Sequence, residues 1–281
     1  MFLLDDAILL AMLREDVPYG DLTTRSLACG KDRGHVLFRA REPMVACAVE
    51  EAARMLELAG CAVDVACSSG DRREAGELIL AAKGRAEGLF AAWKVAQTLV
   101  EWASGVATAT DRIVTAARAV NAEVVVACTR KAIPGTRAMS LKAITAGGAA
   151  IHRTGVSDTL LLFPEHRAFC GGTGLRAQIE TLRARCPERT VMVEVTSREE
   201  AVLAAEYGAD VVQLEKFTPE DVAAVVAALG ATSRARVAAA GGINAGNAAD
   251  YARSGAPILV TSAPYYAKPC DVAVSITPRK E

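Results

Sequence analysis

Six short apolar runs recur through the second half of the chain, separated by segments with helical periodicity. The runs occupy residues 123–128, 158–163, 190–195, 210–214, 235–240 and 257–261. They are continuously apolar rather than alternating, which is typical of parallel strands that are buried on both faces. Helical patterns lie between most of them, at 174–186, 198–207, 218–229 and 246–254. Six strand–helix units predict an α/β barrel, complete or incomplete, in preference to an open sheet.

Helix-end signals support this alternation. Ser197 precedes Arg198-Glu199-Glu200, which gives the capping pattern S-x-x-E. Thr218 is followed by Pro219, a residue favoured at the first helical position. Gly230 stands where a helix C-cap is expected.

The first hundred residues have a different pattern. A short helix is expected at 3–14 and another at 49–59, among strand-like pieces at 35–40, 43–48, 62–67 and 77–82. A long helical stretch, 90–119, loosened near Ser104-Gly105, would lead into the barrel. The alternating tail after Pro264 could return as a strand. We therefore predict an N-terminal α+β domain at 1–107, to which 265–281 returns, and an α/β barrel domain at 108–264.

Composition excludes several classes of protein. A net charge of −1 over 281 residues gives no general attraction to nucleic acid or to an anionic membrane. No run approaches the roughly 20 apolar residues that span a bilayer, and the N-terminus lacks a basic leader. The eight cysteines include no C-x-x-C pair, so neither a disulfide framework nor a structural zinc site is expected. A cytoplasmic location is expected.

Polar side chains follow the predicted strands at their carboxyl ends, where α/β barrels place their active sites. In chain order these are Arg130, Lys131, His166, Glu194, Glu215, Asn244 of the loop Gly241-Gly242-Ile243-Asn244, and Thr261 with Ser262. A second basic pair, His152 and Arg153, lies some twenty residues after the first. The four cations Arg130, Lys131, His152 and Arg153 cannot all be explained by salt bridges with Asp158 or Glu165, although one such bridge is expected. The set therefore predicts a pocket for a small, multiply anionic ligand.

Three parts of this set have specific chemistry. The Gly241-Gly242-Ile243-Asn244 loop with Thr261-Ser262 is typical of a phosphate cradle, helped by the helix that follows; a tight turn that merely needs glycine is the alternative. Glu194 and Glu215 could hold Mg²⁺ or stabilise an oxocarbenium ion, or be ordinary surface carboxylates. Lys131 leaves open a Schiff-base aldolase.

The chain resembles the quinolinate phosphoribosyltransferase family (nicotinate-nucleotide pyrophosphorylase, carboxylating). The motifs that carry the resemblance, in order, are Glu15-Asp16-Val17-Pro18-Tyr19-Gly20-Asp21-Leu22-Thr23, Ser104-Gly105-Val106-Ala107-Thr108, Thr129-Arg130-Lys131-Ala132-Ile133-Pro134-Gly135, His152-Arg153 with Asp158, and Gly241-Gly242-Ile243. The family implies an incomplete α/β barrel with an N-terminal open-faced α+β sandwich. It also implies a homodimer with sites shared between subunits.

The resemblance implies an activity and residue roles. Family members transfer phosphoribose from phosphoribosyl pyrophosphate, with Mg²⁺, to the ring nitrogen of quinolinate, which then loses CO₂. On matching positions Lys94, Arg130, Lys131, His152 and Arg153 would face the acceptor, with His166 nearby. Glu194 and Glu215 would serve the ribose and the metal. Gly241, Gly242 and Ser262 would hold the 5′-phosphate.

Several positions depart from the family pattern, including Met192 and Glu215-Lys216, where the family has E-V-E and L-D-N. Lys94 replaces an arginine, Phe163 replaces a pocket lysine, and Ala240 replaces a serine. Trp93-Lys94-Val95-Ala96-Gln97 and Phe163-Pro164-Glu165-His166 resemble a divergent branch called ModD, which is associated with molybdenum transport systems. The expected function is therefore a phosphoribosyltransferase with an altered acceptor pocket. The alternative is a non-catalytic anion-binding protein of molybdenum transport or metabolism.

Overall fold

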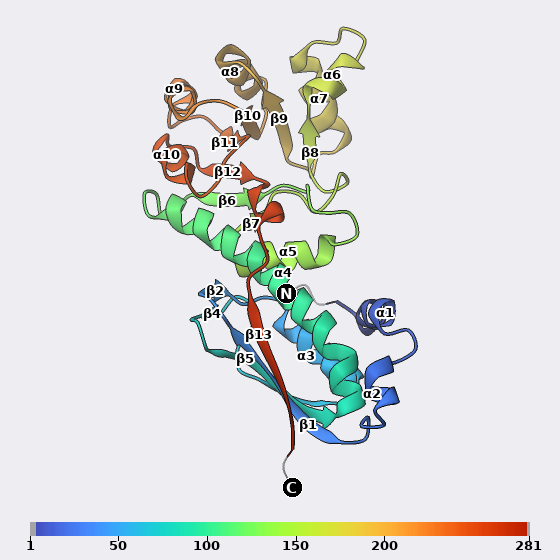
Figure 1. Ribbon diagram of the computed structural model, residues 1–281. Helices are drawn as coiled ribbons and strands as arrows, with labels where there is room; N and C mark the ends of the chain where they lie inside the picture. The colour runs from blue at the N-terminus through green and yellow to red at the C-terminus, as the bar shows by residue number, and fades with distance from the viewer. Residues whose placement is uncertain (1–3, 280–281) are drawn as a thin grey trace. The chain divides into compact units, whose positions relative to one another are not determined.

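The computed structural model describes residues 4–279, which form two compact units (Figure 1). Unit 1 consists of Met1–Asp111, Ala132–Gly148 and Pro264–Glu281, and unit 2 of Arg112–Lys131 and Ala149–Ala263. The ends of the predicted helix 3–14 and of the returning segment 265–281 extend beyond the described residues. The domain boundary at 107/108 stays a prediction, because compactness alone does not show which part folds independently.

Unit 1 contains an antiparallel sheet in the order β13-β1-β5-β3. Its strands are β1 (Arg33–Ala40), β3 (Ala62–Val65), β5 (Leu78–Arg85) and β13 (Val272–Pro278), and its helices include α1 (Asp6–Asp16), α2 (Leu22–Ser26) and α3 (Val49–Leu58). Alternate residues of β1, such as Val36 and Phe38, are fully buried in one core with α3. One face of the sheet is therefore covered, which confirms the open-faced sandwich. The predicted tail strand is present, paired with β1.

The long helix α4 (Ala86–Arg118) is continuous, so the predicted loosening near Ser104-Gly105 is wrong. Ser104 is buried, and its Oγ accepts a hydrogen bond from Cys47 N at 2.9 Å. A Cβ atom at Gly105 would lie 2.3 Å from the Lys268 carbonyl oxygen. The glycine therefore permits close approach of the C-terminal segment, and it does not break the helix.

A buried ion cluster lies inside unit 1. Lys142 on α5 (Arg137–Ala146) is 2% exposed, and its Nζ donates to Glu50 and Glu51 on α3. Ser69 N also donates to Glu50. The sequence did not predict α5, because a lysine on its buried face interrupts the apolar periodicity.

Unit 2 contains seven parallel strands in the order β7-β6-β12-β11-β10-β9-β8. They are β6 (Val125–Cys128), β7 (Ala150–Ile151), β8 (Leu160–Leu162), β9 (Val191–Val195), β10 (Val211–Glu215), β11 (Arg236–Ala240) and β12 (Ile258–Thr261). All six predicted strands are present, and the added β7 has only two residues. The curled sheet begins at β7 and ends at β8 without closing, which confirms the incomplete barrel (Figure 1).

Helices link most of these strands. They are α6 (Pro164–Ala168), α7 (Leu175–Arg185), α8 (Arg198–Glu206), α9 (Pro219–Leu229) and α10 (Ala248–Arg253). Ser197 and Thr218 accept hydrogen bonds from Glu200 N and Asp221 N, as their capping patterns predict. Across residues 4–279, none of the helices combines the length and the apolar character that crossing a bilayer requires.

Candidate active site

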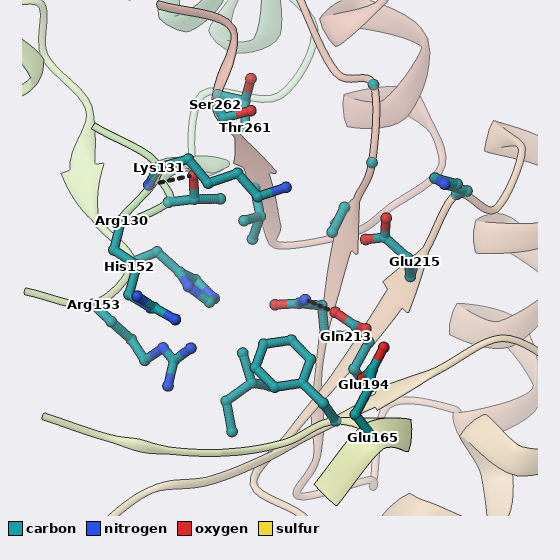
Figure 2. Close-up of a pocket in the computed structure, with 18 residues that line it drawn as sticks. Arg130, Lys131, His152, Arg153, Glu165, Glu194, Gln213, Glu215, Thr261 and Ser262 are labelled. Carbon is teal, nitrogen blue, oxygen red and sulfur yellow. Dashed lines mark hydrogen bonds between the residues drawn. The ribbon is translucent and has the colours of Figure 1, made fainter. Parts of the chain in front are cut away.

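The carboxyl ends of the parallel strands surround a cavity of about 620 Å³ in unit 2 (Figure 2). This volume is in the usual range for a small-molecule site. The predicted site residues that line it are Arg130, Lys131, His152, Arg153, Glu194, Glu215, Gly241, Gly242, Thr261 and Ser262. Parallel strands place their carboxyl ends at one rim, so residues far apart in the chain meet here.

Basic side chains occupy one side of the cavity (Figure 2). Arg153 is 6% exposed, and burial lowers the pKa of its guanidinium, with a further decrease from the charge of Arg130. Burial also lowers the pKa of His152 to about 4; the charge of Arg153 acts in the same direction and the amide of Gln213 opposes it. The imidazole is therefore neutral at pH 7.

Carboxylates occupy the other side (Figure 2). Glu194 on β9 is in register with Gln213 on β10, and Glu215 ends β10. Burial raises the pKa of Glu194, and the charge of Glu215 raises it further. Gln213 Nε2 donates to Glu194 Oε2 at 2.7 Å, which opposes this rise. Two carboxylates that repel each other are a setting in which a cation binds favourably.

Two carboxylates of the cavity are donors of a kind that suits Mg²⁺. Within residues 4–279 there is no cluster of three or more histidine, cysteine or acidic side chains that could hold a metal ion. Mg²⁺ is commonly bound by one or two carboxylates together with phosphate oxygens of the substrate. Glu194 and Glu215 supply that number of carboxylates beside a glycine loop.

The glycine loop lies next to the carboxylates. Gly241 and Gly242 have φ values of +92° and +79°, a region that side chains disfavour. A Cβ atom at Gly241 would lie 2.7 Å from Lys216 Cγ, whereas one at Gly242 would meet no atom of the described residues within 4 Å. Gly242 therefore faces open space, as a phosphate cradle requires. The helix predicted at 246–254 is present as α10, which begins at Ala248, and its contribution to a phosphate site stays a prediction.

Three predicted residues lie elsewhere. Asn244 Nδ2 donates to the Gly242 carbonyl oxygen at 3.1 Å, so this side chain holds the loop and does not line the cavity. His166 Nδ1 accepts from Phe163 N at 3.1 Å, which places the imidazole at the start of α6. Lys94 belongs to unit 1, where its Nζ lies 4.1 Å from the Trp93 ring centroid. A role of Lys94 toward an acceptor stays a prediction.

Thr261 lines the cavity with its hydroxyl already engaged. Its Oγ1 donates to the Ile243 carbonyl oxygen at 2.6 Å and accepts from Ala263 N. Ser262, which also lines the cavity, is the more suitable hydroxyl for a ligand.

Sequence reasoning missed several lining residues, of which Gln213 and Phe163 matter most. Gln213 interrupts the apolar run 210–214, and a polar residue inside a buried strand was the available signal. Phe163 was noted only as a departure from the family pattern. Its ring lies 5.7 Å from the Arg153 guanidinium carbon, so an aromatic face borders the basic side.

Family models match nearly the whole chain. The N-terminal domain model of quinolinate phosphoribosyl transferase matches residues 21–104, and the C-terminal domain model matches 106–275. The chain belongs to this family. The motif-based resemblance is therefore confirmed, and it covers both units.

Named relatives agree with this membership. A Rhodobacter capsulatus protein, "Putative pyrophosphorylase ModD", is 58% identical over 91% of this chain and 98% of the relative. A "Probable nicotinate-nucleotide pyrophosphorylase [carboxylating]" of Archaeoglobus fulgidus is 33% identical over 84% of this chain and 90% of that relative. The crystal structure of NadC from Streptococcus pyogenes superposes with a TM-score of 0.90 at 26% identity, covering 98% of this chain and 97% of that one.

Proposed function

We propose that this protein is a phosphoribosyltransferase. It moves phosphoribose from phosphoribosyl pyrophosphate to a ring nitrogen of a small anionic, heteroaromatic acid and releases pyrophosphate. One observation carries the proposal: a single cavity combines basic side chains on one side, carboxylates on the opposite side (Figure 2) and a glycine loop open to a phosphate next to the carboxylates. Membership in the quinolinate phosphoribosyl transferase family supports the same reaction class.

The carboxylates and the glycine loop form the donor half of the site. Backbone N–H groups at Gly241 and Gly242, with the hydroxyl of Ser262, hold the 5′-phosphate. As the bond from C1′ to pyrophosphate breaks, its electron pair leaves with pyrophosphate and positive charge develops on the ribose. Glu194 and Glu215 stabilise that charge.

The basic side forms the acceptor half. Arg130, Lys131 and Arg153 hold the acid, with His152 as a neutral neighbour, so that a ring nitrogen lone pair points at C1′ and forms the new bond. This orientation requires no covalent intermediate with the protein. Loss of CO₂ follows only if the acceptor carries a carboxylate next to that nitrogen.

Mg²⁺ is the proposed cofactor, held by Glu194 and Glu215 together with donor oxygens. When bound, it neutralises the charge on the departing pyrophosphate. The charge repulsion that raises the pKa of Glu194 supports this assignment.

We also propose a cytoplasmic homodimer with sites shared between subunits, in which Lys94 of one subunit serves the cavity of the other. Tyr19, Leu22 and Leu27 near the N-terminus are 86%, 74% and 70% exposed, and an interface would cover such apolar surface. Sedimentation of the Leu22→Glu variant as a monomer would support this, whereas native protein sedimenting as a monomer would contradict it.

The test of the reaction is mass spectrometry of products formed from phosphoribosyl pyrophosphate, Mg²⁺ and a pool of pyridine and pteridine acids. We expect a new species with the mass of an acid ribonucleotide, lost in Glu194→Gln and retained in the control Glu180→Gln, which changes an exposed residue outside the cavity. Unchanged donor together with tight binding of one anion would instead select a non-catalytic anion-binding protein of molybdenum metabolism. The replacement of the family's pocket lysine by Phe163 and of its serine by Ala240 favours that second candidate.

A further inference from the structure

Three buried polar atoms in the cavity have no hydrogen-bond partner among residues 4–279. They are His152 Nε2, Arg153 Nε and Gln213 Oε1. Buried polar atoms are nearly always paired in folded proteins, and an unpaired one at a cavity wall marks where a ligand supplies the missing group. The kind of atom left unpaired therefore describes the ligand.

The orientation of the Gln213 amide is fixed. Glu194 offers only acceptors as a carboxylate, so the amide nitrogen of Gln213 must face it, and the two atoms lie 2.7 Å apart. The amide oxygen then points the opposite way, toward the basic side of the cavity (Figure 2). Gln213 is 5% exposed, so little water reaches this oxygen. An amide oxygen can only accept. The amide of Gln213 acts electrostatically on His152, but neither His152 Nε2 nor Gln213 Oε1 has a hydrogen-bond partner in residues 4–279, so the imidazole does not satisfy this oxygen. A ligand that presents an N–H or O–H group at this point supplies the missing donor.

Arg153 and Phe163 impose two further requirements. The unpaired Nε–H of Arg153 is a charged donor, for which a carboxylate is the natural partner. The Phe163 ring, 5.7 Å from the guanidinium carbon, offers a flat apolar wall beside that carboxylate. A flat ring with an acidic group satisfies both residues.

We infer that the acceptor is a heteroaromatic acid that carries a hydrogen-bond donor, such as an amino or hydroxyl substituent, in addition to the carboxylate that pairs with Arg153, and that Gln213 selects it. The inference rests on the proposed function, which makes this part of the cavity the acceptor subsite. A second carboxylate facing Gln213 would place two acceptors against each other. Quinolinate should therefore bind more weakly than a pyridine carboxylate that carries an amino group in place of the second carboxylate.

The test compares the binding of matched pyridine acids by isothermal titration calorimetry, with no donor present. The probes are pyridine-3-carboxylate, its 2-amino and 6-amino derivatives, its 2-methyl and 6-methyl derivatives as donor-free size controls, and pyridine-2,3-dicarboxylate. At least one of the amino-substituted pyridine carboxylates should bind about tenfold or more tightly than its methyl analogue, because the analogue leaves Gln213 Oε1 unpaired. Equal affinities for each amino–methyl pair, or no binding of any probe at millimolar concentration, would overturn the inference.

The chain offers a matched control for a Gln213 variant. Gln178 on α7 is 7% exposed, its Nε2 also donates to an oxygen, and its Oε1 also has no partner in the described chain, but it does not line the cavity. Gln213→Met should reduce the amino-over-methyl preference to within about threefold. Gln178→Met should retain it. A preference that survives in Gln213→Met would overturn the assignment to Gln213.

Pyrophosphate release is measured separately with donor and Mg²⁺ present. Tighter binding of the amino-substituted probes than of the methyl-substituted ones, with no pyrophosphate release from any probe, supports the inference and contradicts the transfer reaction. Turnover of the methyl and amino probes with equal kcat/KM supports the transfer reaction and contradicts the inference.

Discussion

Two regions of the molecule bury charge in opposite ways. In unit 1, Lys142 donates to both Glu50 and Glu51, and Ser69 completes the coordination of Glu50. In unit 2, polar atoms of Arg153, His152 and Gln213 at the cavity have no hydrogen-bond partner among the described residues. We call the first set the Lys142 cluster and the second the cavity set. The difference indicates that the Lys142 cluster stabilises the fold, whereas the cavity set is complete only with a ligand.

The pKa directions reflect the same contrast. Burial raises the pKa of Glu50, but hydrogen bonds from Lys142 and Ser69 outweigh it and bring the value to about 2. The pKa of Glu194 is raised by burial and by Glu215, and the bond from Gln213 only partly offsets this. A carboxylate of the Lys142 cluster is thus stabilised as an anion, while one in the cavity still favours an added cation.

The largest expected effect comes from breaking the Lys142 cluster. Lys142→Met would leave Glu51, which is fully buried, without its cation, so we expect a loss of about 3–5 kcal/mol in unfolding free energy. Urea denaturation measures this loss. The control Lys83→Met changes an exposed lysine 3.8 Å from Asp64 and should leave stability unchanged. Equal stability of the two variants would refute the distinction.

Arg153→Met provides the opposite test, because it removes a cation that lacks a full set of partners. Stability should change by less than about 1 kcal/mol, since a buried charge is replaced by an apolar group of similar length. Affinity for pyridine acids should fall by about 2–5 kcal/mol, the usual effect of truncating one side of a buried charge pair. Calorimetry and urea denaturation on the same samples separate the two effects. Arg185→Met, on the exposed part of α7, is the control. If Arg153→Met lost stability but bound pyridine acids with native affinity, Arg153 would stabilise the fold and not bind the ligand.

The pH dependence of stability sharpens the comparison at His152. Its pKa is near 6.5 in the unfolded chain and about 4 when folded, so between these values the unfolded state binds more protons. Native stability should therefore decrease by up to about 3 kcal/mol as pH falls from 6.5 to 4, and this term is absent above pH 6.5. His152→Asn should show a shallower decrease between pH 7 and 5. Parallel pH profiles for the two proteins would show that His152 is not held neutral.

The smallest expected effect distinguishes the two loop glycines. Both have positive φ, but only at Gly241 would a methyl group contact Lys216, so Gly241→Ala should lose about 1 kcal/mol more stability than Gly242→Ala. Gly242→Ala should instead weaken donor binding, because the methyl group enters open cavity space. Gly172→Ala is the control, since Gly172 has φ +81° with nothing within 4 Å and lies outside the cavity. If donor affinity drops equally in Gly241→Ala and Gly242→Ala, backbone strain alone explains why position 242 requires glycine.

The sequence predicted the barrel strands and most of the rim, because continuous apolar runs and polar residues at their ends are local signals. It failed where a tertiary contact decides the structure. Helix α5 was not predicted, because Lys142 lies on its buried face and only the carboxylates of α3 make a buried lysine favourable there. Gly105 looked like a helix break, but its role depends on the distant Lys268 carbonyl. Gln213 was not predicted as a site residue, because its role depends on its hydrogen bond to Glu194 on the neighbouring strand.

The most direct measurement is a crystal structure of the protein with phosphoribosyl pyrophosphate, Mg²⁺ and 2-aminopyridine-3-carboxylate. Our account predicts the 5′-phosphate against Gly242 and Ser262, the metal at Glu194 and Glu215, and the acid's carboxylate on Arg153 with its amino group on Gln213 Oε1. Density for the donor outside this cavity, or a cavity that stays empty of both ligands at saturating concentration, would contradict it.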